Sequence, residues 1–222
     1  IGSTWQNGQY VRTRDVEKCR EAFEDLLLRL KTDYIDLGMI HFVDSTKDWD
    51  DAMGGAYIEY VKELKKSGKI HHIGMSTHNP DMAKKAVESG MVEMLLFSIN
   101  PAFDMLPPTD NIDNYFADHY RDDLFGIDPA RSMLYRLCEQ HGVGLTVMKP
   151  YAGGRLFDEK RSPFGVPLTP VQCIHYCLTR PAVASVMVGC DTAAHVEAAA
   201  AYEEASDSAK DYATTLSRAP YH

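Results

Sequence analysis

Residues 70–100, IHHIGMSTHNPDMAKKAVESGMVEMLLFSIN, contain a complete strand–helix–strand pattern. The short apolar runs at 70–76 and 94–100 predict buried strands. Between them, residues 80–89 predict a helix that begins near Asn79 and is stopped by Gly90. Two strands joined through a helix form a parallel βαβ unit, which places this chain in the α/β class.

The same alternation extends in both directions along the chain. Further strands are expected at 34–42, 144–149 and 183–189, and further helices at 15–31, 51–67, 129–141, 169–180 and 192–205. Two segments, 101–127 and 150–168, interrupt the pattern and are expected to be long loops, which are usually functional or mobile.

Two architectures fit five strands of this kind, a doubly wound open sheet and part of a (β/α)8 TIM barrel. A doubly wound sheet usually opens with a glycine-rich phosphate loop, and the sequence contains neither GxGxxG nor GxxxxGK[ST]. The barrel is therefore preferred. Because a full barrel needs eight strands and about 250 residues, we expect residues 1–222 to form a single, incomplete barrel domain with roughly strands 4–8.

The composition excludes several classes of protein. The 222 residues are 45% hydrophobic and 25% charged, as in a soluble globular protein, and the net charge of -9 disfavours nucleic-acid binding. No apolar run approaches the roughly 18 residues that a membrane span requires. The five cysteines form no CxxC pair, which argues against a zinc site or a disulfide framework and favours a cytoplasmic location.

Several polar residues and glycines follow the predicted strands, where a barrel holds its active site. His41 is either a core histidine or a rigid polar group that takes part in proton transfer. Lys149 is either a phosphate ligand or a solvated lysine, and Gly153 and Gly154 form either a phosphate-binding turn or a plain surface turn. Gly189 precedes a helix start, a potential anion site. No metal site is expected, because His71 and His72 point to opposite faces of a strand.

Five segments in order resemble the aldo-keto reductase family: DYIDLGMIHF (33–42), GKIHHIGMSTH (68–78), FSINP (97–101), VMKPYAGGRL (147–156) and VMVGCDTAAHVEAA (186–199). The resemblance implies a catalytic role for His41 and NADP(H) as cofactor, with NAD(H) as the alternative. The cofactor contacts that it implies come from Ser76, Thr77, Asn100, Met148, Lys149, Pro150, Gly153, Gly154, Arg155, Gly189 and His195. The form MKPYAGG most resembles a bacterial and archaeal branch that often carries an iron–sulphur extension, so such a cluster is expected only if a downstream extension exists.

The chain also departs from the family pattern. Leu96 stands where a glutamine usually helps to hold the carboxamide, and Met148 stands at a stacking tyrosine. His195 aligns with the arginine for the 2′-phosphate, and Ala198 and Ala199 align with a Glu-Asn pair at the adenine. The family's catalytic Asp, Tyr and Lys would all lie upstream of Ile1.

Three functions remain open at this point. The first is NAD(P)H-dependent reduction of a small-molecule aldehyde or ketone by hydride transfer, with no nucleic-acid or membrane partner. The second is a non-catalytic nucleotide-binding barrel that senses redox state or regulates a partner. The third, weaker one is an electron-transfer partner with flavin or an iron–sulphur cluster. An Asp, Tyr and Lys at their family positions upstream would favour catalysis.

Overall fold

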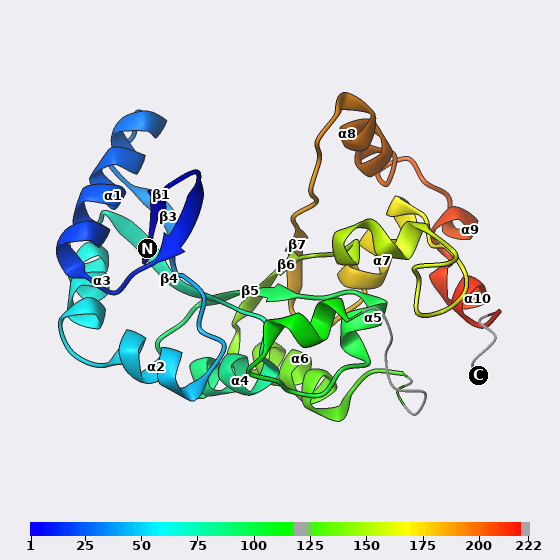
Figure 1. The fold of residues 1–222 in the computed structure, drawn as a ribbon, viewed down its shortest axis with the longest axis horizontal. Helices are drawn as coiled ribbons and strands as arrows, with labels where there is room; N and C mark the ends of the chain where they lie inside the picture. The colour runs from blue at the N-terminus through cyan, green and yellow to red at the C-terminus, as the bar shows by residue number, and fades with distance from the viewer. Residues whose placement is uncertain (118–123, 125, 219–222) are drawn as a thin grey trace.

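A curved parallel sheet forms the centre of the molecule (Figure 1). The computed structural model describes residues 1–117, 124 and 126–218. The sheet contains β3 (Ile35–Ile40), β4 (Ile70–Thr77), β5 (Met94–Ser98), β6 (Gly144–Met148) and β7 (Val183–Val186), all parallel and in chain order. A doubly wound sheet reverses its strand order at a switch point, and this sheet does not. The order is that of successive barrel strands, as the sequence predicts.

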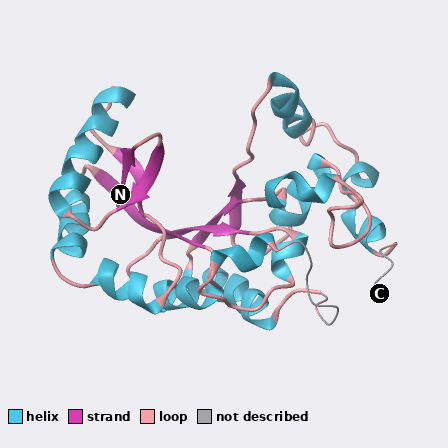
Figure 2. Ribbon diagram, in the orientation of Figure 1, coloured by secondary structure: helices cyan, strands magenta, loops and turns pink. Residues whose placement is uncertain are grey.

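Helices cover the convex side of the sheet (Figure 2). They are α1 (Val16–Leu30), α2 (Thr46–Met53), α3 (Ala56–Lys66), α4 (Pro80–Glu88), α6 (Pro129–His141) and α7 (Pro170–Leu178). Two of these helices begin with side-chain caps, since Asn79 and Thr169 accept hydrogen bonds from the first turns of α4 and α7. No helix in the described part of the chain is long and apolar enough to cross a membrane.

Shorter elements lie in the loops and at the end of the chain. The predicted long loop 101–127 contains α5 (Pro101–Asp104) and the 3-10 helix η1 (Ile112–Phe116), and its residues 118–123 and 125 lie outside the described residues. The second loop contains η2 (Ala152–Phe157). After β7 come α8 (Ala193–Ala200), α9 (Asp207–Lys210) and α10 (Tyr212–Leu216).

Two expectations from the sequence require correction. The helix predicted over 51–67 is two helices, α2 and α3, because the chain breaks at Gly54-Gly55, where Gly55 has a φ of 71°. Residues 3–12 form an antiparallel hairpin that the sequence analysis did not predict, with β1 (Ser3–Gln6) and β2 (Gln9–Arg12) joined at Asn7-Gly8. Asn-Gly is a strong hairpin signal, since both residues tolerate the positive φ of the turn.

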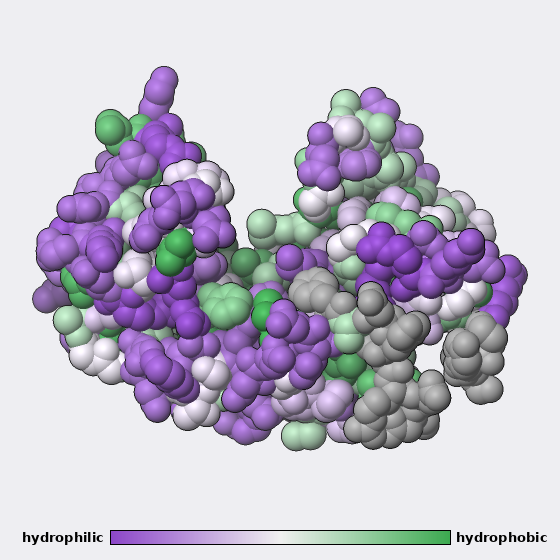
Figure 3. All heavy atoms as spheres, in the orientation of Figure 1, coloured by the Kyte–Doolittle hydropathy of each residue, from purple (hydrophilic) through white to green (hydrophobic). Residues whose placement is uncertain are grey.

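The two faces of the sheet differ in burial. Residues that face the helices, such as Ile40, Met75, Leu95 and Phe97, are fully buried in the main hydrophobic cluster. The opposite face is partly open, and Leu37 on β3 is 40% exposed. Figure 3 shows a hollow between the arm that contains β1, β2 and α1 and the arm that contains α8. The concave face of the described sheet is therefore uncovered over part of its area.

The first residue of the chain extends the sheet at its outer edge. The amino group of Ile1 donates to the Met39 carbonyl at 2.6 Å, and the His41 N–H donates to the Ile1 carbonyl at 3.0 Å. These two bonds on either side of Ile40 form the pattern of a parallel pairing. Ile1 thus lies beside β3 as a residue of a further parallel strand would.

A buried polar cluster near the carboxyl end of β5 fixes α5, α6 and α7 to one another. The Asp104 carboxylate on α5 accepts hydrogen bonds from Tyr135 at 2.5 Å and from Tyr176 at 2.7 Å, and it pairs with Arg131 at 3.4 Å. Burial opposes ionisation and raises the pKa of Asp104 above its usual range, although Arg131 and the two tyrosines counteract this effect. The Arg131 guanidinium also donates to the Ser98 carbonyl at 3.0 Å, which ties the cluster to the end of β5.

Candidate active site

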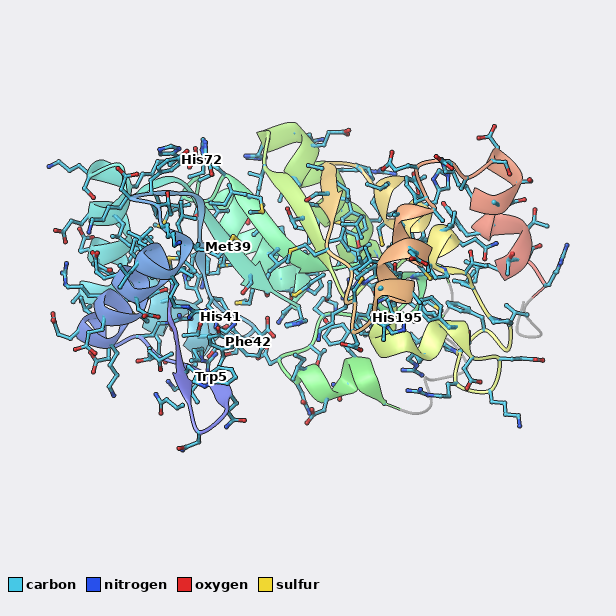
Figure 4. The ribbon with its side chains drawn as sticks, turned by 90° about the horizontal axis from the view of Figure 1, so that it is seen from above. Trp5, Met39, His41, Phe42, His72 and His195 are labelled. Atoms are coloured by element: carbon cyan, nitrogen blue, oxygen red, sulfur yellow. The ribbon has the colours of Figure 1, made fainter. Side chains whose placement is uncertain are left out.

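The predicted site residues lie at the carboxyl ends of the strands or in the segments that follow them, in two groups. His41 and Ser76 belong to the first group, at β3 and β4, and Lys149 and His195 belong to the second, after β6 and β7. Figure 4 shows His41 beside Phe42, with His195 toward the other end of the molecule. Three strand spacings separate β3 from β6, roughly 14 Å. A ligand that touches both groups must therefore extend across several strands.

His41 presents a desolvated imidazole directly after β3. Its Nδ1 atom is buried and has no hydrogen-bond partner in the structure. Burial lowers the pKa of His41 below its ordinary 6.5, and the nearby positive charges of Arg14 and Arg12 lower it further. The imidazole is thus held neutral at pH 7, in the form that can hydrogen-bond a carbonyl oxygen or exchange a proton with it.

The backbone that carries His41 is strained and firmly held. Phe42 has a φ of 54°, a conformation that side chains other than glycine rarely adopt. Its N–H donates to the Ser76 hydroxyl at 2.8 Å, and its carbonyl accepts from Arg12 and Arg14, each at 3.2 Å. Strained residues persist where the surroundings fix them, often at functional sites. Ser76 keeps its own O–H free of this bond, so it can still donate to a ligand.

Asp44 joins the loop after β3 to the end of β4. Its carboxylate accepts hydrogen bonds from the Thr77 hydroxyl at 2.9 Å and from the His78 N–H at 2.6 Å, and it bonds the His78 Nδ1 at 2.9 Å. Burial opposes ionisation of Asp44, but the bonds from His78 and Thr77 outweigh burial and hold its pKa below the usual value. The Thr77 side chain, a predicted cofactor contact, is fully buried on this carboxylate.

Replacing Asp44 with asparagine is expected to destabilise the protein by about 1–3 kcal/mol at pH 7, because buried donors lose their charged acceptor. A carboxylate whose pKa is lowered by folding stabilises the fold above its unfolded pKa of about 3.9, and this stabilisation is lost as the pH falls through the folded pKa. The difference in thermal unfolding between wild type and Asp44→Asn should therefore be largest at neutral pH and shrink below about pH 4. Asp36→Asn, at an exposed carboxylate on β3, is the control. If wild type and Asp44→Asn differed in thermal unfolding by the same amount at neutral pH and below about pH 4, this account would be contradicted.

Asn100 fixes the start of the loop after β6. Its side-chain amide donates to the Lys149 carbonyl at 2.9 Å, while its side-chain oxygen caps α5 by accepting from Phe103 at 2.8 Å. Lys149 has a φ of 60°, so a second strained residue lies at a strand end. Asn100 itself is fully buried. The structure thus places Asn100 behind Lys149, where it orients this residue.

A cavity of about 520 Å³ brings the second group of predicted residues together. Six of the predicted cofactor contacts line it: Lys149, Pro150, Gly153, Gly154, Gly189 and His195. An added Cβ at Gly153, Gly154 or Gly189 would meet no atom within 4 Å apart from its chain neighbours, so open space adjoins all three glycines. Tyr151 also lines the cavity, and its hydroxyl is buried without a hydrogen-bond partner. A long ligand with phosphate groups fits these features.

Two other predicted contacts lie apart from this cavity. Arg155 is 7% exposed, and its guanidinium donates to the Ala117 carbonyl at 3.0 Å and to the Arg161 carbonyl at 3.3 Å. Met148 is half-buried at the end of β6, where it pairs with Ser98. Arg155 therefore fixes neighbouring loops to one another, and Met148 lies at the carboxyl end of β6, directly before Lys149.

The histidines that could suggest a metal have separate partners. His71 lies 3.6 Å from Asp36, His72 bonds Glu93 at 3.0 Å, and His78 bonds Asp44. Within residues 1–117, 124 and 126–218, no three His, Cys, Asp or Glu side chains gather closely enough to hold a metal ion.

The chain is similar to proteins of one family. The model described as "Aldo/keto reductase family" matches residues 6–169. An "Uncharacterized oxidoreductase YqkF" of Bacillus subtilis is 32% identical over 108 residues, which are 48% of this chain and 33% of that protein. "Aldo-keto reductase YhdN" of the same organism is 38% identical over 72 residues, 32% of this chain and 20% of that protein. The chain thus matches a third or less of the length of these two relatives.

The fold is also similar to that of a solved structure. The holo form of aldo-keto reductase AKR11C1 from Bacillus halodurans superimposes with a TM-score of 0.64 and 23% identity. The superposition covers all of this chain and 72% of that one. The five-stranded sheet described above is therefore part of a (β/α)8 barrel.

Proposed function

Because the chain belongs to the aldo/keto reductase family, we propose that it forms part of an NAD(P)H-dependent oxidoreductase that reduces an aldehyde or ketone to an alcohol. The observation that carries the proposal is the cavity in which Lys149, Gly154, Gly189 and His195 meet. These residues come from two segments, the loop after β6 and the β7–α8 segment, and all of them were predicted as cofactor contacts. The oxidoreductase named among the relatives supports catalysis over a purely regulatory nucleotide-binding barrel.

A reduced nicotinamide dinucleotide, when bound, supplies the hydride for the carbonyl carbon. The residues of this chain bind the cofactor, orient the substrate carbonyl and share the proton that its oxygen receives. Lys149 places a positive charge beside the flexible glycine turn, suited to a pyrophosphate. Ser76 offers its O–H near His41, and the neutral His41 orients the substrate carbonyl or shares the proton that its oxygen receives. The resemblance assigns the proton donor itself to a tyrosine upstream of Ile1.

The proposal also concerns partners and location. A small-molecule carbonyl compound is the proposed substrate, and the cytoplasm is the proposed compartment. All five cysteines are free, and four of them are buried, which is compatible with a reducing environment. An iron–sulphur cluster remains proposed only for a protein with a downstream extension.

The proposed activity is tested with the protein at its natural full length and a panel of simple aldehydes and ketones. Loss of NADH or NADPH absorbance together with formation of the matching alcohol, identified by mass spectrometry, is the expected result. Binding of the dinucleotide with no turnover of any carbonyl compound would instead favour the regulatory barrel.

Replacing Lys149 with methionine is expected to weaken cofactor binding by about ten- to hundredfold, because a charged hydrogen bond contributes roughly 1.5–3 kcal/mol. Methionine keeps most of the length of the side chain and removes its charge. Fluorescence titration with the reduced dinucleotide measures the change, and Lys66→Met on α3, away from the cavity, is the control. Unchanged affinity in Lys149→Met would remove this residue from the binding site.

A further inference from the structure

The end of the cavity formed by the β7–α8 segment carries a negative charge. Asp191 and His195 both line the cavity there, together with Ala198. Asp191 directly precedes Thr192, whose hydroxyl caps α8 by accepting from the His195 N–H at 3.3 Å. The start of a helix contributes about half a positive charge. The full negative charge of Asp191 therefore outweighs the helix dipole at this end of the cavity.

His195 does not restore a positive charge. The Asp191 N–H donates to His195 Nδ1 at 3.2 Å, so Nδ1 carries a lone pair and the ring proton is on Nε2. In this arrangement the imidazole is neutral and offers one N–H donor. An arginine at the same position would instead present a permanent cation with a planar fork of donors.

The positively charged side chain that lines the cavity lies outside the β7–α8 segment. Among the described residues that line it, Lys149 is the one lysine or arginine, and it comes from the loop after β6, not from the β7–α8 segment. In the proposed function Lys149 binds the pyrophosphate. The adenosine end of a dinucleotide thus meets Asp191 and a neutral His195.

NADP(H) differs from NAD(H) by a phosphate on the 2′-oxygen of the adenosine ribose. Proteins accommodate this phosphate with arginine, whereas a carboxylate accepts a hydrogen bond from the 2′-hydroxyl and repels the phosphate. Building on the proposed function, we propose that Asp191 makes this chain select NAD(H) over NADP(H). The sequence resemblance favours NADP(H), and the charges at the α8 start reverse that preference.

The proposal is tested by isothermal titration of the full-length protein with NADH and with NADPH, using wild type, Asp191→Asn and Glu197→Gln. Glu197 lies on the same helix but does not line the cavity, so its substitution removes the same charge as a control. Wild type should bind NADH about tenfold more tightly than NADPH, because the like charges of Asp191 and the 2′-phosphate repel each other. Asp191→Asn should lower the ratio of the NADPH to the NADH dissociation constant at least about fivefold, because it strengthens NADPH binding. Glu197→Gln should leave this ratio unchanged.

The outcomes separate this proposal from the proposed function. Tighter binding of NADPH than of NADH by wild type, or the same ratio in Asp191→Asn as in wild type, overturns the role of Asp191 and leaves the reductase assignment standing. Failure of wild type to bind either dinucleotide overturns both. Raising the salt concentration should also reduce the preference of wild type for NADH over NADPH, since Asp191 is exposed and its charge is screened.

Discussion

Replacing His41 with alanine in the full-length protein is expected to lower kcat about a hundredfold while changing cofactor affinity by less than about twofold, in the range found for lost acid–base groups. The imidazole lies at the carboxyl end of β3, and its buried Nδ1 atom has no partner in the protein. The cavity residues that hold the cofactor in this account lie after β6 and β7, several strands away. Loss of the ring should therefore affect the chemical step more than binding.

Steady-state kinetics measure the effect of His41→Ala on kcat, and a cofactor titration measures its effect on cofactor affinity. His71→Ala is the matched control, because His71 lies near the start of β4, stacked on Tyr34 and paired with Asp36. Since burial lowers the pKa of His41 below 6.5, protonation should reduce wild-type kcat only on the acid side of that value. This acid limb should be absent in His41→Ala. A variant with wild-type turnover would contradict the catalytic role.

A polypeptide of residues 1–222 alone is expected to associate and to lack reductase activity. In the described sheet β3 and β7 are the outer strands, and outer strands expose hydrogen-bonding groups that recruit other chains. The concave face adds exposed apolar side chains, with Leu37 at 40% and Met187 at 57%. Each large side chain left in water forgoes about 1.5–3 kcal/mol, and net stability is only about 5–15 kcal/mol. A few such side chains remove much of that margin.

Light scattering over a dilution series and thermal unfolding of this polypeptide test the expectation. Concentration-dependent mass and a broad, weakly cooperative transition are the expected results. Oxidation of NADH with a simple aldehyde should be absent, because the resemblance places the tyrosine donor upstream of Ile1. A monomeric polypeptide that unfolds cooperatively and turns over the aldehyde would contradict each part of this prediction.

Local patterns were sufficient to predict most of the fold. The strands at 70–77 and 94–98 and the helix between them follow from apolar runs, the Asn79 cap and the stop before Gly90. The two helices within 46–66 were harder to predict, because Gly54-Gly55 interrupts a continuous helical spacing. The β1–β2 hairpin carries an Asn-Gly signal, but its strands pack little apolar surface, so the pattern around the turn is weak.

The site was only partly predictable for a different reason. Glycines and a lysine directly after strands are visible in the sequence, and their meeting in one cavity follows from the common direction of parallel strands. The contacts of Asp44 with His78 and of Asn100 with the Lys149 carbonyl join residues more than thirty positions apart. No spacing rule reveals such pairs. Likewise, only the folded chain shows that Arg155 is directed to the Ala117 carbonyl.

The central proposal is that this chain belongs to an enzyme that transfers a hydride from a nicotinamide dinucleotide to a carbonyl carbon. The most direct measurement supplies the full-length protein with NADH in which deuterium replaces both hydrogens of the hydride-donating carbon, together with an aldehyde that it turns over. Mass spectrometry and NMR of the product locate the label. The account predicts an alcohol with one deuterium on the former carbonyl carbon. An alcohol without deuterium at that carbon, or no alcohol from any aldehyde or ketone, would contradict it.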